Sequence, residues 1–146
     1  MRVLIAGAGA FGSFIAQDLL GQNHEVTVLD QNKAVVAELT DRQLSCRLVI
    51  GDACEPRVLE SAGILRADVV IAATGDDEDN LVIALLAHQE FQVPRVVARV
   101  NDPRNGWLFS EWWGVDQALS APDAFLSLVE EKVKSAPHHP VPTQEG

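Results

Sequence analysis

Short, continuous apolar runs recur along the chain, separated by longer segments in which apolar and polar residues mix. The runs read V-L-I-A, R-L-V-I, D-V-V-I-A-A and R-V-V-A-R-V. Runs without polar alternation are typical of parallel strands that are buried on both faces. They predict strands near residues 2–6, 25–30, 45–50, 67–72, 95–100 and 115–119.

The segments between these runs have the start and stop signals of helices. Gly21 follows the first segment, and Pro122 suits the first turn of the last. Asp76 or Asp77 can cap the fourth. We expect helices near residues 10–21, 32–40, 55–62, 77–91, 104–112 and 122–134. The alternation predicts an α/β fold, a Rossmann-like doubly wound parallel sheet of about six strands with helices on both faces.

A glycine turn links the first predicted strand to the first predicted helix. Gly7, Gly9 and Gly12 have the G-x-G-x-x-G spacing, and Asp30 ends the next apolar run, 18 residues after Gly12. This series of strand, glycine turn, helix, strand and carboxylate is what binding of an adenine dinucleotide requires. Gly7 permits a tight turn, Gly9 lets the backbone approach the phosphates, and Gly12 lets the helix lie close to the strand. The pyrophosphate would lie at the N-terminus of the helix, where free N–H groups and the helix dipole favour negative charge.

Asp30 also bears on which nucleotide binds. Its carboxylate would accept hydrogen bonds from ribose hydroxyls and would repel a 2′-phosphate. No arginine follows within reach, although Lys33 is close. The sequence therefore favours NAD or a plain adenine nucleotide over NADP.

Three further strand ends carry polar residues at the edge where a doubly wound sheet binds its ligand. Asp52 and the backbone of Ala53 can hydrogen-bond the edge of an adenine. Thr74 and Gly75 offer a hydroxyl and open backbone to ribose or phosphate. Arg99 can present a fixed positive charge to a phosphate.

Each of these motifs also has a structural interpretation. G-D and T-G-D-D are common turns between a strand and a helix, in which Asp52 and Asp76 cap and the glycines relieve the backbone. Arg99 can instead form an ion pair with the four acidic residues at 76–79. The joint order of the motifs favours binding, and the structural alternatives stay open.

Composition and charge narrow the function classes. At 146 residues the chain has the length of one domain, placed at 1–134, with a Pro-rich flexible tail at 135–146. A net charge of −10 without a basic cluster argues against nucleic acid or an anionic membrane as a direct partner. No apolar stretch is long enough for direct membrane insertion. Cys46 and Cys54 lack zinc-site spacing, which favours free thiols in a reducing cytosol and predicts no metal site.

Together the motifs resemble the N-terminal nucleotide-binding subdomain of RCK (regulator of K+ conductance) proteins, the TrkA and KtrA kind of cytosolic potassium-transport subunit. The resemblance covers residues 1–134 and rests on G-A-G-A-F-G, Asp30, G-D-A, A-D-V-V-I-A-A-T-G-D-D-E-D-N and A-R-V-N-D-P. The A-T-G-D-D-E-x-N string is the most discriminating part, because dehydrogenases that share the glycine turn do not usually carry it.

The resemblance implies that NAD(H) or an adenine nucleotide (AMP, ADP or ATP) binds, and that K+ transport is gated by which nucleotide is bound. It implies a homo-oligomer, a dimer or higher, in the cytoplasm, held at the inner face of the cell membrane through a membrane K+ transporter subunit. The residues expected at the nucleotide are Gly7, Gly9, Ala10, Phe11, Gly12, Asp30, Gln31, Asp52, Ala53, Thr74, Gly75 and Arg99.

Two departures from the family pattern matter. ATP-responsive members often carry arginine in the glycine turn where Ala10 stands here, so a γ-phosphate loses a partner and NAD(H), AMP or ADP is favoured over ATP. The family's C-terminal ligand-sensing subdomain has no counterpart in the 146 residues. Whether the chain is part of a longer protein or a stand-alone half stays open.

The first rival interpretation is an enzyme, either the NAD domain of a dehydrogenase or a small reductase. The chain has no tyrosine, which excludes the Tyr and Lys pair of short-chain dehydrogenases. His24 and His88 have no evident carboxylate partner, and no neighbour of Cys54 would lower its pKa. We therefore expect no catalytic residue. A second rival is an NAD(H)-reading regulator of another partner, such as a repressor or an antiporter, and the absence of a basic recognition helix argues against direct contact with DNA.

Two segments carry apolar residues beyond the expected core. The apolar stripe of helix 122–134 is either core or a surface for self-association, and its place after the last strand favours self-association. Trp107, Trp112 and Trp113 are expected to anchor helix 104–112 on the sheet rather than to stack on a base.

Overall fold

The computed structural model describes residues 1–135, apart from the side chains of residues 124, 125 and 135, and it confirms the predicted α/β architecture. The parallel sheet has the order β3-β2-β1-β4-β5-β6. Its strands are β1 (Arg2–Ala6), β2 (Glu25–Asp30), β3 (Arg47–Ile50), β4 (Val69–Ala72), β5 (Arg95–Val100) and β6 (Gln117–Ser120). The strand order reverses between β1 and β4, which therefore form the switch point of a doubly wound sheet.

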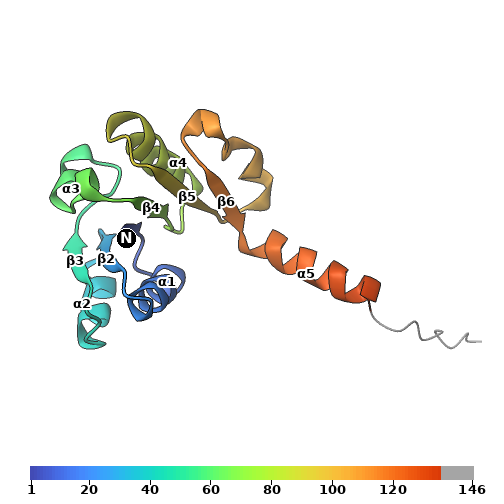
Figure 1. Cartoon of the computed structure of the whole chain (residues 1–146), viewed down its shortest axis with the longest axis horizontal. Coiled ribbons are helices and arrows are strands. Elements are labelled where there is room, and N and C mark those ends of the chain that lie inside the picture. Colours follow the sequence, from blue (N-terminus) through green and yellow to red (C-terminus); the bar gives the residue numbers. More distant parts are fainter. Residues whose placement is uncertain (136–146) are drawn as a thin grey trace, which may run out of the picture.

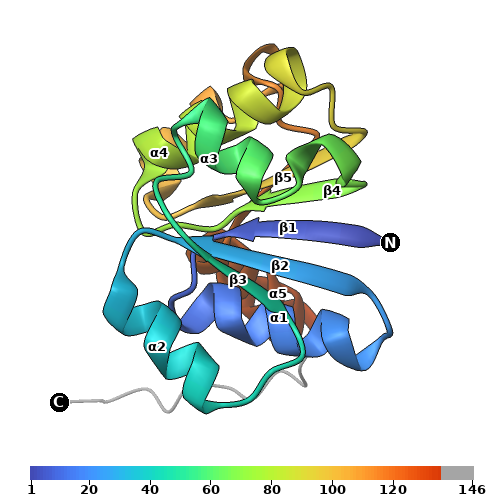
Figure 2. The same cartoon turned by 90° about the vertical axis from the view of Figure 1, so that its left-hand side faces the viewer.

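Helices cover both faces of this sheet (Figure 2). The α-helices are α1 (Ala10–Gly21), α2 (Lys33–Asp41), α3 (Pro56–Ser61), α4 (Asp77–Leu85) and α5 (Ala121–Ser135). The 3₁₀ and π turns are η1 (Ile64–Arg66), η2 (Leu86–Glu90), η3 (Pro103–Leu108) and η4 (Glu111–Trp113). In Figure 2, α1 and α2 lie on one side of the sheet, and α3 and α4 lie on the other.

The core forms two clusters, one on each face. Along β1, Leu4 belongs to the cluster under α3 and α4, whereas Ile5 belongs to the cluster under α1 and α2. Both side chains are at most 2% exposed. Burial on both faces is why the central strands read as continuous apolar runs.

The prediction of one helix over 104–112 is wrong. Two short 3₁₀ turns, η3 and η4, occupy the segment, and the chain leaves helical geometry at Phe109 (φ −85°, ψ 73°). Phe109 turns into the core, where 7% of it is exposed, while Trp107 and Trp112 are 79% and 91% exposed. The expected anchoring is therefore wrong for Trp107 and Trp112, whereas Trp113 is 39% exposed, and Phe109 is the aromatic residue of this segment that packs into the core.

Helix α5 leads away from the rest of the domain (Figure 1). Its side chains Leu126, Leu128, Val129 and Val133 are exposed, so the described residues do not bury the stripe as core. The predicted tail lies outside the described residues, except for its first residue.

Candidate functional site

A cavity of about 530 Å³ opens at the carboxyl ends of β1, β2, β3 and β4, at the switch point. Eleven of the twelve residues expected at the nucleotide line it: Gly7, Gly9, Phe11, Gly12, Asp30, Gln31, Asp52, Ala53, Thr74, Gly75 and Arg99. Ala10, the first residue of α1, is exposed and is not part of the lining.

The three glycines of the turn are required for different reasons. Gly7 has φ +118°, and a Cβ added there would lie 2.5 Å from the carbonyl oxygen of Ala73. A Cβ on Gly12 would overlap the carbonyl oxygen of Gly7. A Cβ on Gly9 would meet nothing within 4 Å, so the fold does not require glycine there. Gly9 instead keeps backbone open at the cavity.

Helix α1 begins at the cavity with a bare N-terminus. Its N-cap is Gly9, no side chain caps it, and its first turn holds no acidic residue. The first N–H groups of a helix have no partner within the helix, and the helix dipole adds positive potential there. An anion is therefore the natural complement of this end of the cavity.

Asp30 is held between the glycine turn and the start of α2. One carboxylate oxygen accepts from the amide of Ala8 (2.8 Å), and the other accepts from the amide of Asn32 (2.8 Å). A carboxylate oxygen accepts more than one hydrogen bond, so both oxygens can still accept from a ligand's hydroxyls. The two backbone bonds fix the direction in which they are offered.

A buried asparagine that sequence reasoning missed holds the opposite wall. Asn80 is fully buried, and its Oδ1 accepts from the amide and the hydroxyl of Thr74 (3.0 and 2.6 Å). Its Nδ2 donates to the carbonyls of Thr74 and Arg99 (3.1 and 2.9 Å). The Thr74 hydroxyl is thus committed within its own loop, where it also accepts from the amide of Asp76 (3.3 Å). The spacing of six residues in T-G-D-D-E-D-N was the available signal.

Asp77 fastens the start of α4 to the segment that follows β5. Its carboxylate accepts from the amide and the side chain of Asn101, from the amide of Asp102 (3.0 Å) and from the side chain of Asn105 (2.9 Å). Burial raises the pKa of this carboxyl, but the hydrogen bonds outweigh burial and hold the pKa below its usual value. The carboxylate stays ionised and ties the cavity wall to the tryptophan-bearing turns.

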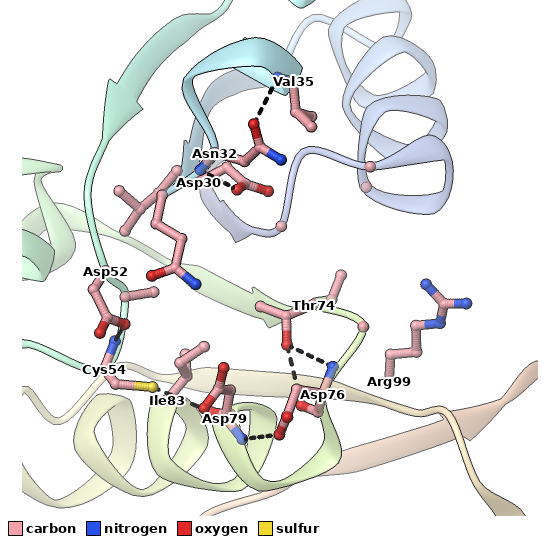
Figure 3. Close-up of a pocket in the computed structure, with 18 of the residues that line it drawn as sticks. Asp30, Asn32, Val35, Asp52, Cys54, Thr74, Asp76, Asp79, Ile83 and Arg99 are labelled. Carbon is pink, nitrogen blue, oxygen red and sulfur yellow. Dashed lines mark hydrogen bonds between the residues drawn. The ribbon is translucent and has the colours of Figure 1, made fainter.

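Arg99 supplies positive charge to the cavity. Its guanidinium lies over the ring of Phe11, 4.5 Å from the ring centroid, and so reaches from β5 to α1. Among residues 1–135 it forms no ion pair, so the alternative of a salt bridge with residues 76–79 is not realised. Figure 3 shows Arg99 beside the Thr74 loop, separate from Asp76 and Asp79.

The acidic residues of the cavity have local structural partners (Figure 3). Asp76 caps α4, because its carboxylate accepts from the amide of Asp79 (3.0 Å), as one of the two predicted caps. Asp52 accepts from the amide of Cys54 (2.9 Å), which is the turn interpretation given above.

The Cys54 thiol is not activated. Burial, together with the nearby carboxylates of Asp79 and Asp52, raises its pKa to about 12. A thiol of this pKa is protonated at neutral pH and is a weak nucleophile. His24 and His88 do not line the cavity.

The described part of the chain contains neither a candidate metal site nor a candidate membrane-spanning helix. Within residues 1–135, no group of histidine, cysteine and acidic side chains could hold a metal ion. Nor does any helix in this range combine the length and apolar character needed to cross a membrane.

The sheet, the glycine turn and the cavity at the switch point define a Rossmann-like α/β domain. The profile of the TrkA-N domain matches residues 3–121. The chain therefore belongs to the TrkA-N domain family.

Named relatives and solved structures agree with this assignment. The Trk system potassium uptake protein TrkA of Mycobacterium tuberculosis (strain ATCC 25618 / H37Rv) is 50% identical over 133 residues, which cover 91% of this chain and 60% of that protein. The AMP-bound form of the Kef CTD from Shewanella denitrificans is 25% identical (TM-score 0.74) over 92% of this chain and 80% of that chain. The ADP-bound structure of GsuK is 25% identical (TM-score 0.75) over 91% of this chain and 34% of that chain. The chain thus spans about three fifths of the curated relative it matches.

Proposed function

We propose that this chain is the nucleotide-binding regulatory domain of a potassium uptake or channel system, and that it binds NAD(H) or an adenine nucleotide in the cavity at the switch point. The observation that carries the proposal is the pairing of the bare N-terminus of α1 with Arg99 on the same cavity. Together they offer an anion both backbone donors and a full positive charge.

The proposed pose follows from the charges of the cavity. Phosphates lie at the start of α1, where the backbone is open at Gly9, and Arg99 contacts them from the other side. Asp30 accepts from the ribose hydroxyls and disfavours the 2′-phosphate of NADP. Ala10 brings no charge to the turn, so NAD(H), AMP and ADP are preferred to ATP.

The names of related proteins support the potassium system. TrkA of M. tuberculosis is named a potassium uptake protein, and the related solved structures hold AMP in Kef and ADP in GsuK. We propose by this likeness that the domain lies in the cytoplasm, assembles with copies of itself and contacts a membrane K+ transporter subunit.

Regulation requires two nucleotides that engage the cavity differently. Only a difference in binding free energy between two conformations can move a gate, and couplings of about 1–3 kcal/mol are typical. The hydrogen bonds of Asn80 connect the cavity to β5, and those of Asp77 connect the start of α4 to the segment after β5. We propose this wall as the path by which the bound nucleotide acts on the rest of an assembly.

We propose that the nucleotide is bound and left unchanged. Cys54 is the cysteine that lines the cavity, and its raised pKa keeps the thiol protonated, which supports this proposal. A dehydrogenase would consume NADH with a carbonyl substrate, so oxidation of NADH well above background across a panel of carbonyl compounds would contradict it.

Calorimetry with NAD, NADH, AMP, ADP and ATP tests the binding proposal. Gly9→Val should abolish binding, because the new side chain would occupy the space left for phosphate. Gly21→Val is the matched control, since Gly21 lies at the far end of α1 and an added Cβ there also meets nothing within 4 Å. Normal binding by Gly9→Val would overturn the site assignment.

Rubidium uptake tests the transport proposal. In cells that lack the gene for this chain, expression of the wild-type chain should restore the rate of rubidium uptake. Expression of Gly9→Val should not restore it. If the wild type and Gly9→Val both restore uptake, the chain's role in transport does not depend on a nucleotide bound in this cavity.

A further inference from the structure

A second cavity lies at the opposite end of the sheet. Its volume is about 390 Å³, and it shares no lining residue with the cavity at the switch point. Arg2 begins β1, Arg47 begins β3 and Arg66 ends η1, and all three line it. The amino ends of parallel strands meet at one edge, so residues distant in the chain converge there.

The charge of this cavity is opposite to that of the protein as a whole. Three arginines and one carboxylate, that of Glu25, line the cavity, and the carboxylate of Asp68 lies beside it, where it accepts from the amide of Arg2 (2.8 Å); the net charge of the chain is −10. The cavity is therefore a local concentration of positive charge on an acidic protein. Such a concentration attracts small anions and holds them by hydrogen bonds as well as by charge.

Two of the three guanidinium groups form hydrogen bonds within the protein, and the third forms none with residues 1–135. Arg47 Nη2 donates to the carbonyl of Ser61 at the end of α3 (2.9 Å), and Arg2 Nε donates to Glu25 (3.0 Å). Arg66 has no side-chain hydrogen bond or ion pair with any residue in 1–135. Because each guanidinium carries five N–H donors, most of the donors remain for a ligand.

The lining of the cavity limits the size of the ligand that it can hold. Its apolar lining includes Val3, Leu4 and Val26, each at most 5% exposed, and Gly63 turns the chain beside Arg47 with φ +89°. A Cβ added to Gly63 would lie 3.9 Å from Arg47 Nη1, so this wall sits close to the guanidinium. A compact molecule with two or more oxyanion charges fits both the size and the charge.

We infer that this cavity is a second ligand site, for a small polyanion that carries phosphate or carboxylate groups, gripped by Arg2, Arg47 and Arg66. The site is separate from the nucleotide cavity and does not depend on the function proposed for it. Arginine is suited to both groups because its planar fork matches two oxygens at once.

Amide NMR of the chain titrated with inorganic pyrophosphate or with citrate tests this inference. The amides of Gly63 and Arg66 should shift and saturate at millimolar concentration. Shifts at Gly12 report any binding in the nucleotide cavity and so keep the two sites apart. The tighter of the two probes identifies the phosphate or the carboxylate as the preferred group.

Three substitutions sharpen the test. Arg47→Ala and Arg66→Ala should each weaken binding about tenfold or more, through loss of charge-assisted hydrogen bonds. Arg66→Ala removes no side-chain hydrogen bond or ion pair within residues 1–135, so it stays informative if Arg47→Ala is unstable. Glu25→Gln should tighten binding, since it removes the competing carboxylate.

Arg95→Ala is the matched control, because Arg95 begins β5 at the same edge of the sheet and does not line the cavity. It should bind as the wild type does. Absence of shifts at Gly63 and Arg66 with either probe, or equal weakening by Arg95→Ala, would overturn the inference.

Discussion

Two helices begin at the same cavity, and their first turns differ in charge: that of α1 is neutral and that of α4 is acidic. Helix α1 starts with Gly9, without a side-chain cap or an acidic residue, whereas α4 starts with the Asp76 cap followed by Asp77, Glu78 and Asp79. The free donors of α1 remain available to a ligand. At α4 the Asp76 carboxylate accepts from the amide of Asp79, and three further acidic residues stand in the first turn.

The comparison shows that a helix start becomes an anion site only if the protein leaves it unfilled. The dipole is a property of both helices, but carboxylates in the first turn of α4 neutralise its potential. In the proposed pose the phosphates therefore lie at α1, and α4 serves as structure. Arg99 strengthens the difference because its guanidinium lies over Phe11 of α1.

Substitution of one glycine at each helix start gives the largest expected effect. A Cβ at Gly9 or at Gly75 meets nothing within 4 Å, so Gly9→Val and Gly75→Val should both fold. We expect Gly9→Val to weaken binding of AMP about a hundredfold or more, by occluding the phosphate position, and Gly75→Val to weaken it far less. Calorimetric titration measures both. Equal losses would show that the two helix starts contribute alike.

Removal of Arg99 should come next in size. Arg99→Ala is expected to weaken binding of AMP and ADP about tenfold or more, because a charge-assisted contact with phosphate is lost. Binding of adenosine, which has no phosphate, should change little. Similar losses for AMP and adenosine would remove Arg99 from the phosphate site.

Asp30→Ala should weaken binding of NAD about tenfold, through loss of hydrogen bonds to the ribose. The same change should narrow the preference for NAD over NADP, because the repulsion of the 2′-phosphate disappears. Calorimetry with both dinucleotides checks the two effects. Unchanged affinity for NAD would contradict the ribose assignment.

Loss of the α4 cap should separate stability from binding. Asp76→Ala is expected to lower the free energy of unfolding by about 1 kcal/mol. It should leave AMP binding unchanged or tighten it slightly, since a carboxylate leaves the cavity. Asn32→Ala is the matched control, because Asn32 lines the same cavity as the neutral cap of α2 and accepts from the amides of Ala34 and Val35, so its loss removes a cap but no charge. Urea titration measures the free energy of unfolding of each variant, and calorimetry measures its affinity for AMP. Weaker AMP binding by Asp76→Ala, without the same loss in Asn32→Ala, would contradict the view that the start of α4 has only a structural role.

The smallest expected effect depends on pH. The folded-state pKa of Asp77 lies below its ordinary value of 3.8, so its stabilisation is fully present above that value and is lost as the pH falls through the folded pKa. Asp77→Asn should therefore be less stable than the wild type by about 1 kcal/mol near pH 6, with a smaller difference near pH 3. Urea titrations across this range measure it, and a difference independent of pH would show that the charge of Asp77 is not involved.

The sequence predicted the part of the site that depends on local rules. A G-x-G-x-x-G turn between a strand and a helix has few conformations. Gly7 has the positive φ that a tight turn requires, and Gly12 lies so close to the carbonyl of Gly7 that a Cβ would not fit, as the spacing predicts. The order of the elements was likewise predictable, because burial on both faces leaves a continuous apolar run in each central strand. These rules act over a few residues.

The sequence could not predict features that depend on distant partners. Asn80 reads as an ordinary helix residue until the carbonyl of Arg99 is placed beside it. Phe109 and Trp107 are similar apolar residues in the sequence, and only packing decides that Phe109 is buried and Trp107 exposed. The arginines of the second cavity are 19 to 64 residues apart and meet only through the sheet.

Amide NMR of the chain titrated with AMP tests the central comparison most directly. If the phosphate lies at the uncapped helix start, the amides of Phe11 and Gly12 should show the largest shifts, and those of Glu78 and Asp79 should change little. Largest shifts at Glu78 and Asp79, with none at Phe11 and Gly12, would contradict the account.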